Sequence, residues 1–361
     1  MLFLLVLSFL LSVPAFSQTA ESYRKQAIEL SRNKSWDQAI ENYRKALAIE
    51  PDDADTHYNF ALTLKYKGEA KAAVDEFEAA ARLRPKWADP HYGLGATWYD
   101  LHDTPAALKE LRTAVQLDSA NAGARRLLAR VYLEQNNPSS AAGELRRALQ
   151  LKPSAEMHFE LGLAEGQLGN LGAAAAQFRH AIQVAPDLAA AHSRLGVTLR
   201  RQGDPKSALA EFRKAADLDP KNPEAQYDLG MELKAGGDLV GAVGSFRRAI
   251  DLKPDFEKAR YNLGIALRAQ GQTTASQAEL RELKGLHEFR TRLAQSKSLI
   301  LQGVEALKQQ KLDEALASFQ KSVEESPELA TGHYYCGVVW GRKGDTARAL
   351  AAYQRALDLK P

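Results

Sequence analysis

The 361-residue chain is short of several residues and patterns on which common protein functions depend. Its one cysteine, Cys336, excludes an internal disulfide and a cysteine zinc cluster, and we interpret it as a small core residue. The 48 basic and 45 acidic residues leave a net charge of only +3, which argues against bulk electrostatic binding to nucleic acid. The sequence also lacks an HExxH metal motif, a glycine-rich phosphate loop, a serine nucleophile elbow and a conspicuous carboxylate pair. We therefore expect neither an enzyme nor a cofactor or metal site.

Long apolar runs are absent except at the N-terminus, where Leu2–Val13 is uncharged and is followed by Pro14, Ala15 and Ser17. This run is shorter than the roughly 20 residues of a membrane-spanning helix, so we interpret residues 1–17 as a signal peptide. No Lys or Arg precedes the run, which leaves open an uncleaved anchor or a start further upstream. The sequence predicts an exported protein, periplasmic if the leader is cut. If it is not cut, the protein is anchored to the inner membrane, and only then is membrane contact expected.

The chain is rich instead in one repeated phrase. "YQRALDLKP" closes the chain, and "FRRAIDLKP" and "FRKAADLDP" end at Pro254 and Pro220. The prolines that close such phrases are Pro51, Pro85, Pro153, Pro186, Pro220, Pro254, Pro327 and Pro361. Most are separated by 34 residues; Ser119 fills the one empty place, and one interval of 73 contains a longer repeat. We count ten repeats: 20–53, 54–87, 88–121, 122–154, 155–188, 189–222, 223–256, 257–295, 296–329 and 330–361.

Three positions share a character in every repeat when the closing proline is numbered 32. Position 8 is always Gly or Ala, position 20 is Ala in all repeats but one, and position 24 is Tyr, Phe or Leu. Small residues let two helices approach closely, and the large residue fills the space beside them. The proline ends the second helix, and the glycine in turns such as "QGD" suits a left-handed helix cap. Each repeat is therefore predicted to be two antiparallel helices.

This pattern resembles the tetratricopeptide repeat family from Ala20 to the end of the chain. The resemblance implies an all-α fold, a right-handed α–α superhelix or solenoid of about ten helix-turn-helix repeats. We divide the chain into a signal peptide (1–17), repeats one to eight (18–295) and repeats nine and ten (296–361). In repeat eight Glu288 takes the place of the proline. We predict an overlong second helix there that ends near Gln295, either a hinge or a tolerated insertion.

Five of the eight histidines occupy position 4 of their repeats: His57, His91, His158, His192 and His333. Equivalent helices of neighbouring repeats lie about 10 Å apart, whereas zinc needs its ligands within about 2.1 Å of one point. We interpret these histidines as packing residues.

The resemblance also implies that the first helix of each repeat lines a concave groove, mainly through positions 2, 5, 9, 12 and 13. Carried over, with Arg194 at position 6, the candidate groove residues are Tyr58, Tyr92, Arg194, Arg200, Arg201, Tyr227, Lys234, Tyr261 and Arg268. Tyrosine offers apolar area with a polar tip, and arginine can hold a carboxylate with two hydrogen bonds. The set favours an extended protein segment with acidic side chains. The alternative is that the tyrosines pack between repeats and the cations are only solvated.

Two binding patterns known in the family do not match this sequence. The carboxylate clamp for chaperone tails fails because repeat one offers Arg24 and Ile28 where Lys and Asn are required. The asparagine ladder of the sugar-transferase relatives is reduced to Asn59 and Asn262. We expect a non-catalytic scaffold for protein interactions, with envelope assembly or secretion as its setting. The alternative is the targeting arm of an enzyme, such as a glycosyltransferase, whose catalytic domain is missing or on another chain. Glycan recognition by the tyrosines is a third interpretation.

Overall fold

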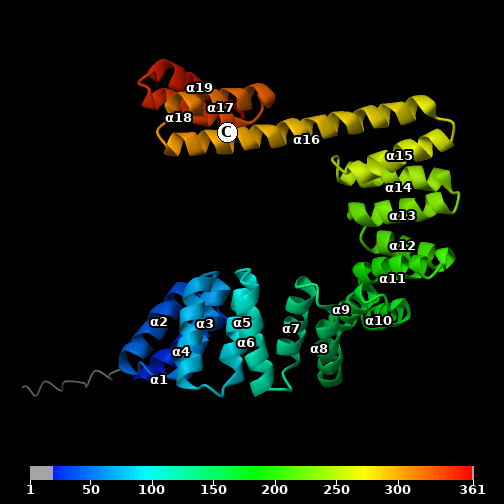
Figure 1. Cartoon of the computed structure of the whole chain (residues 1–361). Coiled ribbons are helices and arrows are strands. Elements are labelled where there is room, and N and C mark those ends of the chain that lie inside the picture. Colours follow the sequence, from blue (N-terminus) through cyan, green and yellow to red (C-terminus); the bar gives the residue numbers. More distant parts are fainter. Residues whose placement is uncertain (1–18, 360–361) are drawn as a thin grey trace, which may run out of the picture. The chain divides into compact units, whose positions relative to one another are not determined.

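The computed structural model describes residues 19–359, and these residues contain helices and no strand (Figure 1). The predicted signal peptide lies outside them. Nineteen helices follow one another in this described part, and nearly every repeat has a first helix of 13 residues and a second of 14. Among the described residues, no helix combines the length and the apolar character needed to cross a membrane.

The chain divides into two compact units, residues 1–208 and 209–361, and each is described by itself. The helices of the first unit are α1 (Ala20–Arg32), α2 (Trp36–Ile49), α3 (Ala54–Lys67), α4 (Ala70–Leu83), α5 (Ala88–Asp100), α6 (Thr104–Leu117), α7 (Ala122–Glu134), α8 (Pro138–Leu151), α9 (Ala155–Gln167), α10 (Leu171–Val184) and α11 (Ala189–Arg201). Helix α12 (Pro205–Leu218) contains the boundary. The helices of the second unit are α13 (Pro223–Ala235), α14 (Leu239–Leu252), α15 (Glu257–Ala269), α16 (Thr273–Lys308), α17 (Leu312–Glu325), α18 (Ala330–Arg342) and α19 (Thr346–Leu359).

Consecutive helices pack against each other within each unit. The two helices of a repeat, such as α5 and α6, make the closest association, and the second helix then packs against the first helix of the next repeat, as α4 does against α5. Figure 1 shows this succession in α1–α8. A helix pair cannot bury its apolar face alone, so each neighbour covers part of it. The predicted all-α solenoid of helix pairs is confirmed.

The small and large positions interlock as the sequence predicts. The position 24 side chains Tyr43, Phe77, Phe212, Phe246 and Phe319 are at most 1% exposed. A Cβ added at Gly230 would lie 2.7 Å from Phe246 Cε1, and one added at Gly303 would lie 2.5 Å from Phe319 Cε1. In these two repeats a side chain at position 8 would overlap the ring, whereas repeats one and two seat Tyr43 and Phe77 beside Ala27 and Ala61.

The turn between the two helices needs a left-handed residue in every repeat. Gly68, Gly169, Gly203, Gly237, Gly271 and Gly344 have positive φ angles, as predicted for the turn glycines. In the other four repeats the same place is filled by Lys34, His102, Asn136 and Gln310, with φ between 55° and 60°. The packing of the two helices thus imposes the conformation even where an L side chain makes it unfavourable.

Three of the position 4 histidines, His57, His192 and His333, contact the carbonyl oxygen of the proline that closes the preceding repeat. His57 Nδ1 lies 2.6 Å from Glu76 Oε2 in the second helix of its own repeat, and His57 Nε2 lies 2.8 Å from the carbonyl oxygen of Pro51, which closes the preceding repeat. Arg125 makes the same two contacts, with Glu144 Oε2 and the Ser119 carbonyl. These contacts support the packing interpretation. No group of residues within 19–359 is arranged to hold a metal ion.

Helix α16 differs from the prediction for repeat eight. The predicted end near Gln295 is wrong, because α16 continues without interruption to Lys308 and joins the second helix of repeat eight to the first helix of repeat nine (Figure 1). Arg290 ties its middle to the start of α15 through Asp255 (2.9 Å) and Glu257 (2.8 Å). With Glu288 in place of proline, nothing stops the helix. The helix therefore has no break at residue 295 that would support the hinge interpretation.

Both sides of this junction carry residues that suit a break in stacking. Positions 3, 7 and 10 of repeat nine are exposed and polar, as in repeat one, whereas repeat two buries Thr56, Phe60 and Thr63 there. The two polar sets are Ser22, Gln26 and Glu29 in repeat one and Ser298, Gln302 and Glu305 in repeat nine. In repeat eight Leu283 stands at position 27, where every other repeat has Ala or Ser. At these positions repeat nine therefore resembles the first repeat of a stack more than a repeat that packs on a preceding one.

Candidate peptide-binding surface

The predicted tyrosines Tyr58 and Tyr227 are largely packed within the repeats. The Tyr58 ring lies 5.8 Å from that of Phe77 and 4.7 Å from that of Trp87, and burial raises the pKa of its hydroxyl to about 12. Tyr227 has the same kind of neighbours in Phe246 and Phe256. The packing alternative considered from the sequence thus applies to these two side chains, each of which is only partly exposed.

Tyr92 lines a hollow of about 400 Å³ formed by α5, α7 and the start of α9. Arg126, Arg130 and Lys152 also line it, together with Glu156. Much of this positive charge is already engaged: Arg126 holds Glu160 of α9 through Nη2 at 2.9 Å and Nε at 3.0 Å, and Arg130 donates to the Tyr99 hydroxyl. The hollow is therefore polar, and its two arginines already make hydrogen bonds within the protein.

The predicted cations are divided between the two units. Arg194, Arg200 and Arg201 are exposed on or beside α11 of the first unit, and Arg268 is exposed on α15 of the second. Tyr261, also on α15, is 51% exposed. Because the residues belong to different units, a continuous basic stretch over repeats six to eight stays a prediction.

Lys234 of α13 takes part in a polar group that joins repeats seven and eight. Its Nζ donates to Asn262 Oδ1 at 2.5 Å, and Asn262 Nδ2 lies 3.4 Å from the Tyr227 hydroxyl. Asn262 is only 9% exposed, and its amide also donates to the Lys258 carbonyl. The structure thus brings Tyr227 and Lys234 together through an asparagine that the sequence did not assign to the site.

A second hollow, of about 620 Å³, lies between repeats one and two and was missed by the sequence reasoning. Its lining residues are Ile28, Ser31, Arg32, Lys34, Trp36, Tyr43, Asn59, Leu62, Thr63 and Tyr66. Several are at positions 9, 12 and 13 of the first helices, but Lys34 and Trp36 belong to the turn and the start of the second helix. A search restricted to groove positions could not find them.

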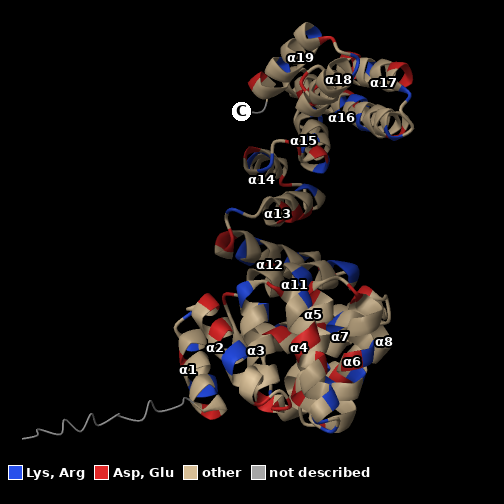
Figure 2. Cartoon of the chain, turned by 90° about the vertical axis from the view of Figure 1, so that its left-hand side faces the viewer, with Lys and Arg blue, Asp and Glu red and all other residues tan. Residues whose placement is uncertain are grey.

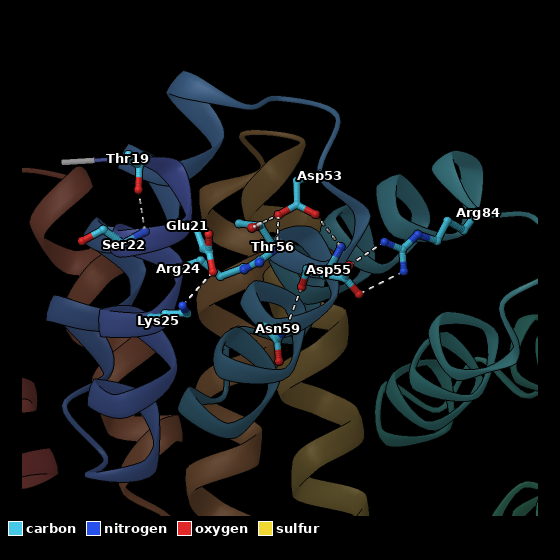
Figure 3. Close-up of polar contacts among 10 residues, drawn as sticks. All are labelled: Thr19, Glu21, Ser22, Arg24, Lys25, Asp53, Asp55, Thr56, Asn59 and Arg84. Atoms are coloured by element: carbon cyan, nitrogen blue, oxygen red, sulfur yellow. Dashed lines mark hydrogen bonds and ion pairs between the residues drawn. The ribbon is translucent and has the colours of Figure 1, made fainter. Parts of the chain in front are cut away.

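The start of α3 is fixed by a network around Asp53 (Figure 3). Asp53 Oδ2 accepts from Arg24 Nη1 of α1 and from Thr56 Oγ1, both at 2.6 Å, while Oδ1 caps the helix at the Asp55 amide. Burial acts to raise the pKa of Asp53, but the Thr56 hydrogen bond and the Arg24 charge outweigh it and hold the pKa below its usual value. Asp55 in turn pairs with Arg84 of repeat two. The network holds α1 and α3 in register.

Comparison with protein families now identifies the repeat. The family profile described as tetratricopeptide repeat matches residues 159–223, 227–289 and 300–361, more than half of the chain. The chain belongs to the tetratricopeptide repeat family. Further profiles of tetratricopeptide repeats match residues 28–68, 54–86 and 99–158. No curated protein matches the chain significantly.

Solved structures of tetratricopeptide repeat proteins resemble the fold. The C-terminal part of a repeat-containing protein from Cytophaga hutchinsonii has a TM-score of 0.55 and 16% identity, covering 66% of this chain and 98% of that one. A tetratricopeptide repeat protein from Parabacteroides merdae gives 0.51 and 16%, covering 69% and 99%. PilF of Pseudomonas aeruginosa gives 0.50 and 19%, covering 57% and 95%. At these identities the likeness concerns the fold alone.

A third hollow, of about 460 Å³, lies on the last tetratricopeptide repeat, on a surface that the next helix covers in other repeats. It is lined by Ala330, Thr331, Tyr334, Tyr353, Ala356 and Leu357. The equivalent residues of repeat two include Phe77 and Ala80, which are fully buried beside α5. This hollow is thus a face on which a helix packs in other tetratricopeptide repeats, and none of its lining residues among those the structure describes is charged. Elsewhere the two signs of charge are interspersed along the helices (Figure 2).

Proposed function

We propose that this tetratricopeptide repeat protein is a non-catalytic scaffold that holds a segment of a partner protein on the surface of its first helices. The observation that carries the proposal is that first-helix residues, with the adjoining turns, line the two hollows of about 620 and 400 Å³ in the first unit. Family membership supports it, because these repeats commonly serve protein interactions. A grooved surface that combines tyrosines with cations suits an extended segment.

The acidic character of the partner is part of the proposal. Arg200, Arg201 and Arg268 are exposed on first helices, and arginine can hold a carboxylate through two parallel hydrogen bonds. Such contacts weaken as salt rises, because the Debye length falls from about 10 Å at 0.1 M to about 3 Å at 1 M. A partner held this way should dissociate at high ionic strength.

We further propose that the protein works outside the cytoplasm of a bacterial cell, in envelope assembly or secretion. The support is the leader "MLFLLVLSFLLSVPAFSQTA", with its short apolar run followed by small residues. Sequencing the N-terminus of the mature protein tests this directly. A mature chain that begins at Gln18 supports export, and a chain that retains Met1 in the soluble cytoplasmic fraction contradicts it.

Affinity capture from envelope extracts tests the scaffold. The full chain is compared with the triple variant Arg200→Ala, Arg201→Ala, Arg268→Ala, and with a control in which the exposed outer residues Lys71 and Arg82 become Ala. We expect the same partner to be recovered by the parent and the control but at least tenfold less by the triple variant. No reproducible partner contradicts the scaffold, and equal recovery by all three proteins contradicts the arginine assignment.

A further inference from the structure

We propose that the hollow between repeats one and two is a site for an apolar side chain flanked by Asp or Glu in a partner's peptide segment. This inference rests on the proposed function and specifies one of its binding sites. The site is named here the first-repeat hollow and consists of the ten lining residues given above, including Arg32, Lys34, Trp36 and Tyr66.

The walls of the first-repeat hollow are apolar and aromatic. Ile28 and Leu62 contribute aliphatic surface, and the Trp36 and Tyr66 rings stack with centroids 6.3 Å apart and planes within 17°. Tyr66 is nevertheless 73% exposed, so most of this one ring faces solvent. Covering an exposed aromatic face with an apolar side chain releases water and so stabilises the complex.

The two wall hydroxyls, Ser31 and Thr63, and the amide nitrogen of Asn59 make hydrogen bonds inside the protein. Ser31 Oγ donates to the Ala27 carbonyl or to Thr63 Oγ1, Thr63 Oγ1 donates to the Asn59 carbonyl, and the Asn59 amide donates to Asp55. A sugar would need several unused donors and acceptors to converge on its hydroxyls. The walls are therefore suited to an apolar side chain rather than to a glycan.

The rim of the hollow is positive. Arg32 and Lys34 line it, none of the ten lining residues is acidic, and neither cation has an ion-pair partner within residues 19–359. Two nearby acidic residues already pair with Lys67, whose Nζ lies 2.6 Å from Asp37 Oδ1 and 2.7 Å from Glu69 Oε1. The hollow lined by Tyr92 differs, because Glu156 lines it and Arg126 is held by Glu160. Charge complementarity thus places an acidic, apolar segment in the first-repeat hollow.

Selection from a displayed library of random twelve-residue peptides against the full chain tests this site. Enriched peptides are then made with a fluorescent label, and their affinity is measured by anisotropy for the parent and three variants. The variants are Arg32→Glu with Lys34→Glu, Tyr66→Ala, and the outer-face control Lys71→Glu with Arg82→Glu, which carries the same change in charge. All the altered side chains except that of Tyr66 are exposed cations, and circular dichroism verifies that each variant folds.

We expect the enriched peptides to share an apolar residue next to Asp or Glu. Their affinity should fall at least tenfold with Arg32→Glu and Lys34→Glu and at least fivefold with Tyr66→Ala, and it should be unchanged in the control. Peptides that bind equally to all variants overturn this site but leave the scaffold standing. An absence of enriched peptides counts against both. A labelled single-stranded oligonucleotide that competes for the hollow overturns the assignment to a peptide.

Discussion

At the scale of single residues, Gly230 shows how little space the repeat allows. Its backbone lies against the fully buried Phe246 ring, so that even one added methyl group would overlap it. We expect Gly230→Leu to lower the free energy of unfolding by about 1–3 kcal/mol through overpacking. Chemical denaturation followed by circular dichroism measures the change.

Gly244 in the second helix of the same repeat is the matched control. It is exposed and a Cβ there would meet no atom within 4 Å. Gly244→Leu should leave stability unchanged or raise it by up to about 1 kcal/mol, because leucine favours a helix more than glycine does. If both variants have the same stability, the register of positions 8 and 24 is wrong.

Asp53 gives the N-terminal repeats a dependence on pH. Because its folded pKa is lowered below its unfolded value of about 3.9, the carboxylate stabilises the fold above that pH. This contribution is lost as pH falls through the folded pKa. We expect Asp53→Asn, which keeps a helix-capping side chain, to cost about 1 kcal/mol at pH 7 and progressively less below pH 4. Denaturant titrations at pH 7 and pH 3 measure the difference.

The neighbouring exposed Asp52 provides the control for this measurement. Asp52→Asn removes the same charge without touching Arg24 or Thr56, and we expect the same stability as the parent at both pH values. A cost of Asp53→Asn that does not shrink at low pH would show that the carboxylate charge is not what stabilises α1 against α3.

At the scale of elements, α16 distinguishes this chain from a uniform array of repeats. Glu288 lies in the interior of this 36-residue helix, at the place where most other repeats have a proline. We expect Glu288→Pro to destabilise the second unit by about 3 kcal/mol, because proline removes a hydrogen bond and clashes with the preceding turn. Glu288→Ala should leave it unchanged. Equal stability of the two variants would show that the chain turns here as it does at Pro254.

The helices were predictable because each repeat carries its own local signals. The small position 8, the large position 24, the turn residue and the closing proline fix where each helix begins and ends. Helix α16 was only half predicted, since Glu288 showed that a stop was missing but not how far the helix would continue. The exposed polar residues Gln302 and Glu305, which match Gln26 and Glu29 of repeat one, were the signal that could have shown it.

The binding surface was less predictable than the fold. Position 5 tyrosines such as Tyr58 are needed for packing between repeats, so their position alone does not distinguish binding from structure. The first-repeat hollow depends on Trp36 stacking on Tyr66, two residues 30 apart that meet only when two repeats pack. Sequence positions within one repeat cannot show such a contact.

At the scale of the whole molecule, the nearly balanced charge gives no strong long-range field, so the proposed binding depends on local surfaces. The buried position 24 rings stabilise each helix pair, and most residues that line the two hollows of the first unit belong to first helices and turns. Packing and lining roles meet in Tyr43, which is buried and also lines the first-repeat hollow.

Photo-cross-linking in the cells that make the protein tests most directly whether the first helices are the working surface. A photoreactive amino acid replaces Tyr66, which lines the first-repeat hollow, or the exposed Glu78 of α4, which lines none of the hollows described here. We predict that Tyr66 becomes attached to one acid-rich segment of a partner and that Glu78 does not. The same products from both positions, or no partner from Tyr66, would contradict the proposal.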